Sequence, residues 1–125
     1  MTTSVGALGR HIALVGFMGA GKTTVGREIA RHTERPFVDL DDEIGRRHGP
    51  VPRIFAEQGE AVFRGLESEE LARALASPVP SVIALGGGAI VTHGNRELLT
   101  AHAAFVAWLD VDAEEAWKRT RGGGR

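Results

Sequence analysis

Strongly apolar residues gather in short runs along the chain, and longer stretches with apolar residues at helical spacing separate these runs. The short runs predict buried strands at residues 12–15, 37–38, 81–85 and 104–109. The stretches between and after them predict helices at about residues 21–32, 43–47, 54–58, 60–75, 94–102 and 112–119. Strands that alternate with helices are typical of an α/β protein with a parallel sheet.

The composition fits a single folded domain over residues 1–125, because 42% of these residues are hydrophobic. The net charge of −1 creates no overall field that would attract nucleic acid or an anionic membrane, so we expect neither as a partner. The sequence has no cysteine, no secretory signal pattern and no apolar stretch long enough to cross a bilayer, which predicts a cytoplasmic location. We interpret Trp108 and Trp117 as packing residues.

The segment from Gly16 to Thr23 carries the most specific chemistry in the sequence. It matches the phosphate-loop pattern G-x-x-x-x-G-K-[ST] at every fixed position. It lies between a predicted strand and a predicted helix, an arrangement that directs backbone N–H groups and the helix dipole at phosphate oxygens. We therefore expect the cofactor ATP to be contacted by Gly19, Ala20, Gly21, Lys22, Thr23 and Thr24.

Two side chains of this loop are expected to act directly on the phosphates. Lys22 would reach the β- and γ-phosphates and take part in catalysis, and the Thr23 hydroxyl would bind Mg²⁺. The alternative interpretation is a glycine-rich turn with an incidental lysine, which the strand and helix on either side argue against. A dinucleotide-binding G-x-G-x-x-G pattern does not fit, because residue 24 is threonine.

Acidic residues cluster directly after the second predicted strand. Asp39 and Asp41 are two residues apart at its carboxyl end, which is where open α/β sheets bind their ligands. One carboxylate can therefore face a metal ion while the other faces a substrate. The alternative is that Asp41 or Asp42 only caps the following helix. For Asp42 and Glu43 we prefer this structural interpretation.

Two further features allow either a structural or a functional interpretation. Arg64 and Glu67 lie on one face of a predicted helix, where an isolated pair would be a solvated surface contact of little energetic value. Alternatively, Glu67 orients Arg64 to grip a carboxylate or a phosphate with two hydrogen bonds. Gly86, Gly87 and Gly88 follow a predicted strand, either as a flexible connection or as backbone that a ligand approaches closely.

Taken together, the chain resembles the shikimate kinase family from Ile12 onward. The resemblance rests on four motifs in the order typical of that family, at residues 16–23, 39–41, 59–67 and 85–89. It implies a P-loop NTPase-like, three-layer α/β/α fold around a parallel sheet of strand order 2-3-1-4-5. It also implies ATP-dependent phosphorylation of the 3-hydroxyl of shikimate, with Mg²⁺ as the metal ion.

The resemblance also implies a role for individual residues. Asp39 would hold Mg²⁺ through water, with Thr23 as a second protein ligand. Asp41 would contact the substrate hydroxyl and act as the catalytic base. Arg64 would pair with the shikimate carboxylate, and the segment Gly86, Gly87 and Gly88 would close over the substrate.

Three more positions match the family less directly. Phe55 and Phe63 resemble the apolar wall of the substrate site, and Arg119 resembles a residue that lies against the adenine. The family continues beyond the point where this sequence stops, at Arg125, into a lid, a second substrate-binding arginine, an adenine loop, a fifth strand and a closing helix. We therefore expect a chain that is incomplete at its C-terminus and poorly active by itself.

The same comparison leads to expectations about assembly and about competing functions. A full-length protein is expected to be a monomer, whereas a fragment without the fifth strand would expose residues 104–109 as an apolar edge that pairs with another chain. Another small-molecule kinase of the same superfamily, such as a gluconate kinase, stays open as an alternative, although Arg64 favours a carboxylate over a neutral polyol. A non-catalytic nucleotide-binding module is the other alternative.

Overall fold

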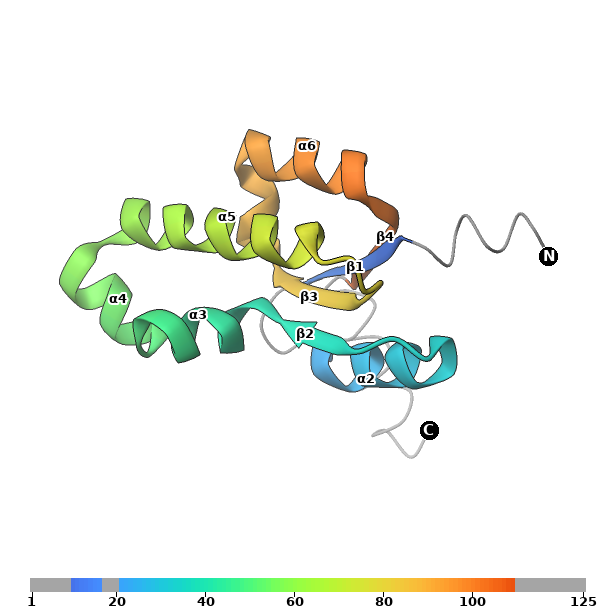
Figure 1. Ribbon diagram of the computed structural model, residues 1–125. Coiled ribbons are helices and arrows are strands. Elements are labelled where there is room, and N and C mark those ends of the chain that lie inside the picture. The colour runs from blue at the N-terminus through green and yellow to red at the C-terminus, as the bar shows by residue number, and fades with distance from the viewer. Residues whose placement is uncertain (1–9, 17–20, 110–125) are drawn as a thin grey trace, which may run out of the picture.

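Four parallel strands form the sheet at the centre of the protein (Figure 1). The computed structural model describes residues 10–16 and 21–109. Its strands are β1 (His11–Gly16), β2 (Phe37–Asp39), β3 (Val82–Gly86) and β4 (Ala103–Leu109). They lie in the order β2-β3-β1-β4, and every neighbouring pair is parallel. This order confirms the predicted α/β class and agrees with the expected family order over these four strands.

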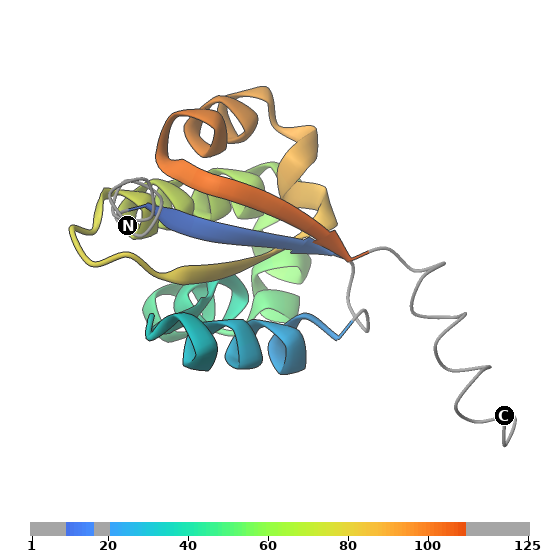
Figure 2. The same cartoon turned by 90° about the vertical axis from the view of Figure 1, so that its right-hand side faces the viewer.

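Helices cover both faces of this sheet. They are α2 (Lys22–Thr33), α3 (Leu40–His48), α4 (Val51–Gln58), α5 (Glu60–Ala76), the short 3-10 helix η1 (Gly87–Val91) and α6 (His93–His102). Helices α5 and α6 lie on one side of the sheet and α2 lies on the other (Figures 1 and 2). The predicted helix at 112–119 and Trp117 lie outside the described residues.

Two of these helices begin earlier than the sequence predicted. Helix α3 begins at Leu40 instead of residue 43, because the side chain of Asp39 accepts hydrogen bonds from the first free backbone amides. Helix α4 begins at Val51 rather than 54, directly after Pro50, and a second proline lies within its first turn. Proline is well tolerated there because these amides have no partner within the helix.

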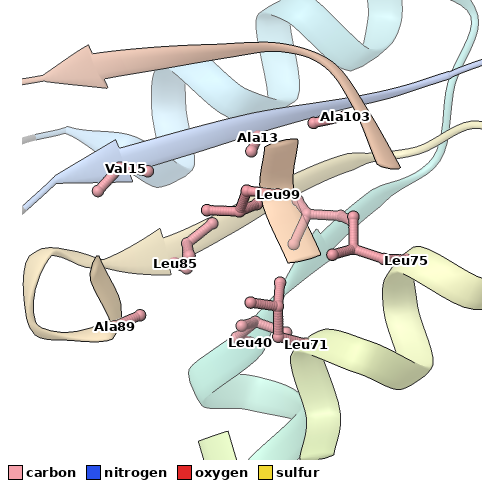
Figure 3. Packing of buried hydrophobic residues seen from close by; sticks show 10 residues of the cluster. Ala13, Val15, Leu40, Leu71, Leu75, Leu85, Ala89, Leu99 and Ala103 are labelled. Carbon is pink, nitrogen blue, oxygen red and sulfur yellow. The ribbon is translucent and has the colours of Figure 1, made fainter. Parts of the chain in front are cut away.

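The alternation of side chains along the strands divides the core between the two faces. Ala13 and Leu85 belong to the cluster that α5 and α6 cover. Ile12 and Val82 point to the other face, where they pack with Ala30 of α2. Figure 3 shows the first cluster gathered between the sheet and the helices, with Ala89 near the carboxyl end of β3. The two central strands, β1 and β3, are thus buried on both faces, as expected for a parallel sheet.

Strand β4 lies at one edge of the sheet in the part of the chain that the structure describes. The exposure of its side chains differs from the prediction. Trp108 was expected to be a packing residue, but 56% of it is exposed, and Val106 is also exposed. Within the described residues β4 pairs only with β1, so one side of the strand has no neighbouring strand. An edge strand buries less of its side chains than a central strand does.

A sharp corner joins α4 to α5, and from this corner α5 runs back toward the sheet (Figure 1). Gly59 has a φ of 93° and donates its N–H to the carbonyls of Ile54 and Phe55. This left-handed φ region is open to glycine at little cost. Beyond the corner, Phe63 packs with Ile44 and Ile54 in a separate small cluster. The corner therefore sets the direction in which the next residue, Arg64, projects.

Candidate active site

A cavity of about 630 Å³ opens where the strands end. This volume is within the usual range for small-molecule sites. It brings together all the predicted site residues that the structure describes, namely Gly21, Lys22, Thr23, Thr24, Asp39, Asp41, Arg64, Gly86, Gly87 and Gly88. The other predicted site residues, Gly19, Ala20 and Arg119, lie outside the described residues. Residues distant in the sequence meet here because parallel strands direct their carboxyl ends to one edge of the sheet.

The phosphate-loop side of the cavity is built by β1 and α2. Gly21 has a φ of 81° at the N-cap of α2, a conformation that suits glycine. Lys22 begins the helix, and its Nζ donates a hydrogen bond to the carbonyl of Gly16 at 2.7 Å. The ammonium group therefore lies between the end of β1 and the N-terminal end of α2, where anions bind favourably.

The acidic side of the cavity depends on the junction of β2 with α3. Asp39 Oδ1 accepts hydrogen bonds from the backbone N–H groups of Asp41, at 2.9 Å, and Asp42, at 3.2 Å. The capping residue is therefore Asp39, and our suggestion that Asp41 or Asp42 caps this helix was wrong. The turn is tight enough for the earlier carboxylate to reach both amides, which leaves the Asp41 side chain free to face the cavity.

The environment of Asp41 favours its neutral form more than water would. The walls of the cavity limit hydration of the carboxyl, and the negative charge of Asp39 adds to this, so the pKa of Asp41 is raised above 3.8. Lys22 acts in the opposite direction and only partly compensates. A carboxylate with a raised pKa, facing a cavity, is a reasonable candidate for a general base.

Arg64 is held from three sides. Its Nη1 donates to Glu67 Oε1 at 2.9 Å, Glu60 lies 3.5 Å away, and the guanidinium lies 5.2 Å from the centre of the Phe63 ring. The Glu67 side chain is only 4% exposed, so the pair is not a solvated surface contact. Burial raises the pKa of Glu67, and Arg64 partly offsets this rise. These contacts favour the second interpretation, in which Glu67 orients the arginine.

The three glycines lie in regular secondary structure and not in an irregular loop. Gly86 ends β3, and Gly87 and Gly88 begin the 3-10 helix η1. A Cβ atom on Gly88 would lie 2.5 Å from Nη2 of Arg64, whereas a Cβ on Gly86 would meet nothing within 4 Å. A side chain at residue 88 would therefore displace the guanidinium of Arg64, and this contact gave no sign in the sequence.

The apolar wall lies beside these charged groups. The rings of Phe55 and Phe63 have centroids 4.6 Å apart, and both residues line the cavity together with Val51. Asp42 also lines it, although we had assigned this residue to helix capping alone. Neither Val51 nor Asp42 belongs to a recognisable pattern, so only their position in the structure identifies them.

Thr23 and Asp39 are the residues that would hold Mg²⁺. Both line the cavity and offer oxygen atoms, the ligands that Mg²⁺ prefers. Among residues 10–16 and 21–109 no group of three or more His, Cys, Asp or Glu side chains could hold a metal ion. This donor set fits Mg²⁺, which commonly takes one or two protein ligands and completes its coordination with phosphates and water.

A phosphate-loop sequence after a central parallel strand, with an acidic pair and an arginine across one cavity, is typical of the P-loop kinase fold. The family model described as shikimate kinase matches residues 18–125, and the chain belongs to this family. A shikimate kinase of Symbiobacterium thermophilum is 48% identical over 115 residues, and one of Ruegeria pomeroyi is 42% identical over 116 residues. These matches cover 91% and 92% of this chain but only 65% and 58% of the relatives, so the chain spans about three fifths of their length.

Solved structures agree with this membership. The shikimate kinase from Acinetobacter baumannii in complex with shikimate matches with a TM-score of 0.80 and 38% identity, over 98% of this chain and 69% of that one. A gluconokinase from Sinorhizobium meliloti matches with a TM-score of 0.61 and 21% identity, over 93% and 67%, which shows a common fold. No helix in the described part of the chain is long and apolar enough to cross a membrane.

Proposed function

We propose that the protein transfers the γ-phosphoryl group of ATP to the 3-hydroxyl of shikimate. The observation that carries this proposal is that Lys22, Asp41 and Arg64 line one cavity. A phosphate-binding cation, a candidate base and a carboxylate-binding cation are the groups that phosphorylation of a hydroxy acid needs. Family membership and a relative solved with shikimate support the choice of substrate.

The phosphate loop would bind and orient the nucleotide. Backbone amides at the start of α2 and the ammonium group of Lys22 would hold the phosphates and stabilise charge on the transferred group. Mg²⁺, held by Thr23 and by Asp39 through water, would neutralise further charge on the phosphates. Because phosphoryl transfer needs position and charge stabilisation more than covalent help, these groups would account for much of the catalysis.

Asp41 would accept the proton of the attacking hydroxyl. Its raised pKa makes it a stronger base than an ordinary aspartate. Its backbone is held by the Asp39 cap, so the carboxylate is directed from a fixed helix start. This rigidity limits the motion that the base must lose before reaction.

Arg64 would receive the carboxylate of the substrate. The Nη1 atom is already bonded to the buried Glu67, so the remaining donors of the guanidinium can face the cavity. Phe55 and Phe63 provide apolar surface against which a carbon ring can pack. A rigid cyclic acid would use both features at once.

The two alternatives are less well supported. A carboxylate-binding arginine does not by itself separate shikimate from gluconate, since both are acids, but the gluconokinase is similar only at the level of fold. A non-catalytic nucleotide-binding module would need no acid pair or arginine opposite the phosphate loop. The presence of both in one cavity favours catalysis.

The test is an assay of ADP release on the full-length protein with shikimate, gluconate and nucleoside monophosphates in parallel, and with the product identified by mass spectrometry. We expect phosphorylation of shikimate alone, dependent on Mg²⁺. The Glu43→Gln protein serves as a control, because Glu43 lies on the same helix as Asp41, does not line the cavity and has no proposed role. Turnover of gluconate without turnover of shikimate would contradict the proposal.

A further inference from the structure

We propose that Asn95 is a positioning residue for substrate binding, which holds the main chain of Gly88 against the guanidinium of Arg64. This inference rests on the proposed function, because it takes Arg64 as the group that receives the substrate carboxylate. Asn95 lies in the first turn of α6 and does not line the cavity. Its influence on the substrate would therefore be indirect.

The contact that carries the inference is a buried hydrogen bond to the residue after Gly88. Asn95 Nδ2 donates to the carbonyl of Ala89 at 3.0 Å. Asn95 is 1% exposed and Ala89 is completely buried. On its other side Gly88 lies against the guanidinium, since a Cβ at this position would lie 2.5 Å from Nη2 of Arg64. The glycine is thus held between the arginine in front and an anchored carbonyl behind.

Arg96 braces the same helix η1 further along. Its Nη1 donates to the carbonyls of Ile90, at 2.5 Å, and Val91, at 3.3 Å. The start of α6 therefore supplies side-chain donors to three successive carbonyls of η1. Arg96 is exposed and acts on the end of η1 away from the glycines, so Asn95 is the donor that controls Gly88.

The burial of Asn95 is costly in one respect. Its Oδ1 atom is buried and has no hydrogen-bond partner among the described residues. A buried polar atom without a partner reduces stability, and an apolar side chain of similar size would avoid this particular cost. The amide instead provides the hydrogen bond to the carbonyl of Ala89, and a positioning role requires this bond.

The test compares three variants of the full-length protein. Asn95→Asp keeps the shape of the side chain and removes the donor that faces Ala89, and Asn95→Leu removes both polar atoms. Leu99→Ala is the matched control, because Leu99 is a buried core residue of the same helix without a side-chain hydrogen bond to η1. KM for shikimate, KM for ATP and the melting temperature are measured for each.

We expect both Asn95 variants to raise KM for shikimate about tenfold, the effect of losing a hydrogen bond of ordinary strength, and to leave KM for ATP within about twofold. Leu99→Ala should lower the melting temperature and leave the ratio of the two KM values unchanged. Equal changes in both KM values for the Asn95 variants, or the same change in ratio for Leu99→Ala, would overturn the inference.

Hydrogen exchange separates this inference from the proposed function. Amides of the segment 86–91 should exchange faster in the Asn95 variants than in Leu99→Ala at matched stability, and unchanged exchange would overturn the inference. If the wild-type protein fails to phosphorylate shikimate, the proposed function is wrong. If the wild-type protein turns over shikimate and the Asn95 variants have unaltered KM values, only the positioning role of Asn95 is refuted.

Discussion

Asp39 acts on Asp41 in two ways. Its Oδ1 accepts a hydrogen bond from the backbone N–H of Asp41 at 2.9 Å, and its negative charge helps to raise the pKa of the Asp41 carboxyl. One residue thus fixes the backbone of the proposed base and adds to the rise in pKa that burial causes. The two effects can be separated experimentally, because asparagine preserves the capping oxygen and removes the charge.

Replacing the proposed base should abolish most of the turnover. In Asp41→Asn we expect kcat to fall by about 10²-fold or more, because no group remains to accept the hydroxyl proton. KM for Mg·ATP should hardly change, since the phosphate loop is intact. Steady-state kinetics measure this, with Glu43→Gln as the control, because Glu43 is on the same helix and does not line the cavity. A loss of nucleotide affinity with kcat preserved would show that Asp41 acts on the metal site instead.

The acidic limb of the pH profile should report the pKa of Asp41. Because burial and Asp39 raise this pKa, the fall in kcat/KM on acidification should be centred above pH 3.8. Asp39→Asn should move the limb to lower pH, measured at saturating Mg²⁺ to offset any weaker binding of the ion. An unmoved limb in Asp39→Asn would mean that another group controls the profile.

Asp41 should reduce stability at neutral pH. Between pH 3.8 and the raised pKa of Asp41, this carboxyl binds more protons in the folded protein than in the unfolded chain. The free energy of unfolding therefore falls as pH rises through this window, and it stays lower at higher pH. Asp41→Asn should therefore melt at a higher temperature than the wild type at pH 7, and the difference should shrink below pH 3.8. A lower melting temperature at pH 7, followed by circular dichroism, would contradict this.

The pair of Arg64 and Glu67 should affect the binding of shikimate and not of ATP. Arg64→Lys loses the two-pronged grip on a carboxylate, and Glu67→Gln loses the charge that orients the guanidinium. Each should raise KM for shikimate by at least about tenfold, as expected when a charged hydrogen bond is weakened.

The control for this pair is Arg73→Lys. Arg73 lies on the same helix and contacts the buried Glu70 at 3.5 Å, but it does not line the cavity. We expect both of its KM values to remain at the wild-type level. If Arg64→Lys also leaves KM for shikimate unchanged, the arginine does not receive the carboxylate.

Two helical glycines should respond to alanine in opposite directions. A Cβ at Gly26 would lie 2.2 Å from Cε1 of Phe37, so Gly26→Ala should destabilise the protein by about 1–3 kcal/mol through overpacking between α2 and β2. A Cβ at Gly65 meets nothing within 4 Å, so Gly65→Ala should stabilise by up to about 1 kcal/mol through helix propensity. Urea unfolding measures both, and a gain in Gly26→Ala would refute the packing described.

Much of the fold and part of the site could be predicted because the relevant information is local. The run Ile12 to Val15 shows a buried strand, and the phosphate loop is recognisable because its chemistry depends on consecutive residues such as Lys22 and Thr23. The acid pair at Asp39 and Asp41 is recognisable for the same reason, since both follow directly after a strand.

The tertiary structure decided how these segments meet. The exposure of Trp108 depends on its strand lying at an edge, and the burial of Glu67 depends on how α5 packs. The contact of Gly88 with Arg64 and the anchor from Asn95 join separate elements. Periodicity and motifs report the spacing of residues within one segment. The contacts of Gly88, Asn95 and Glu67 depend instead on which segments pack together. That packing results from the core as a whole.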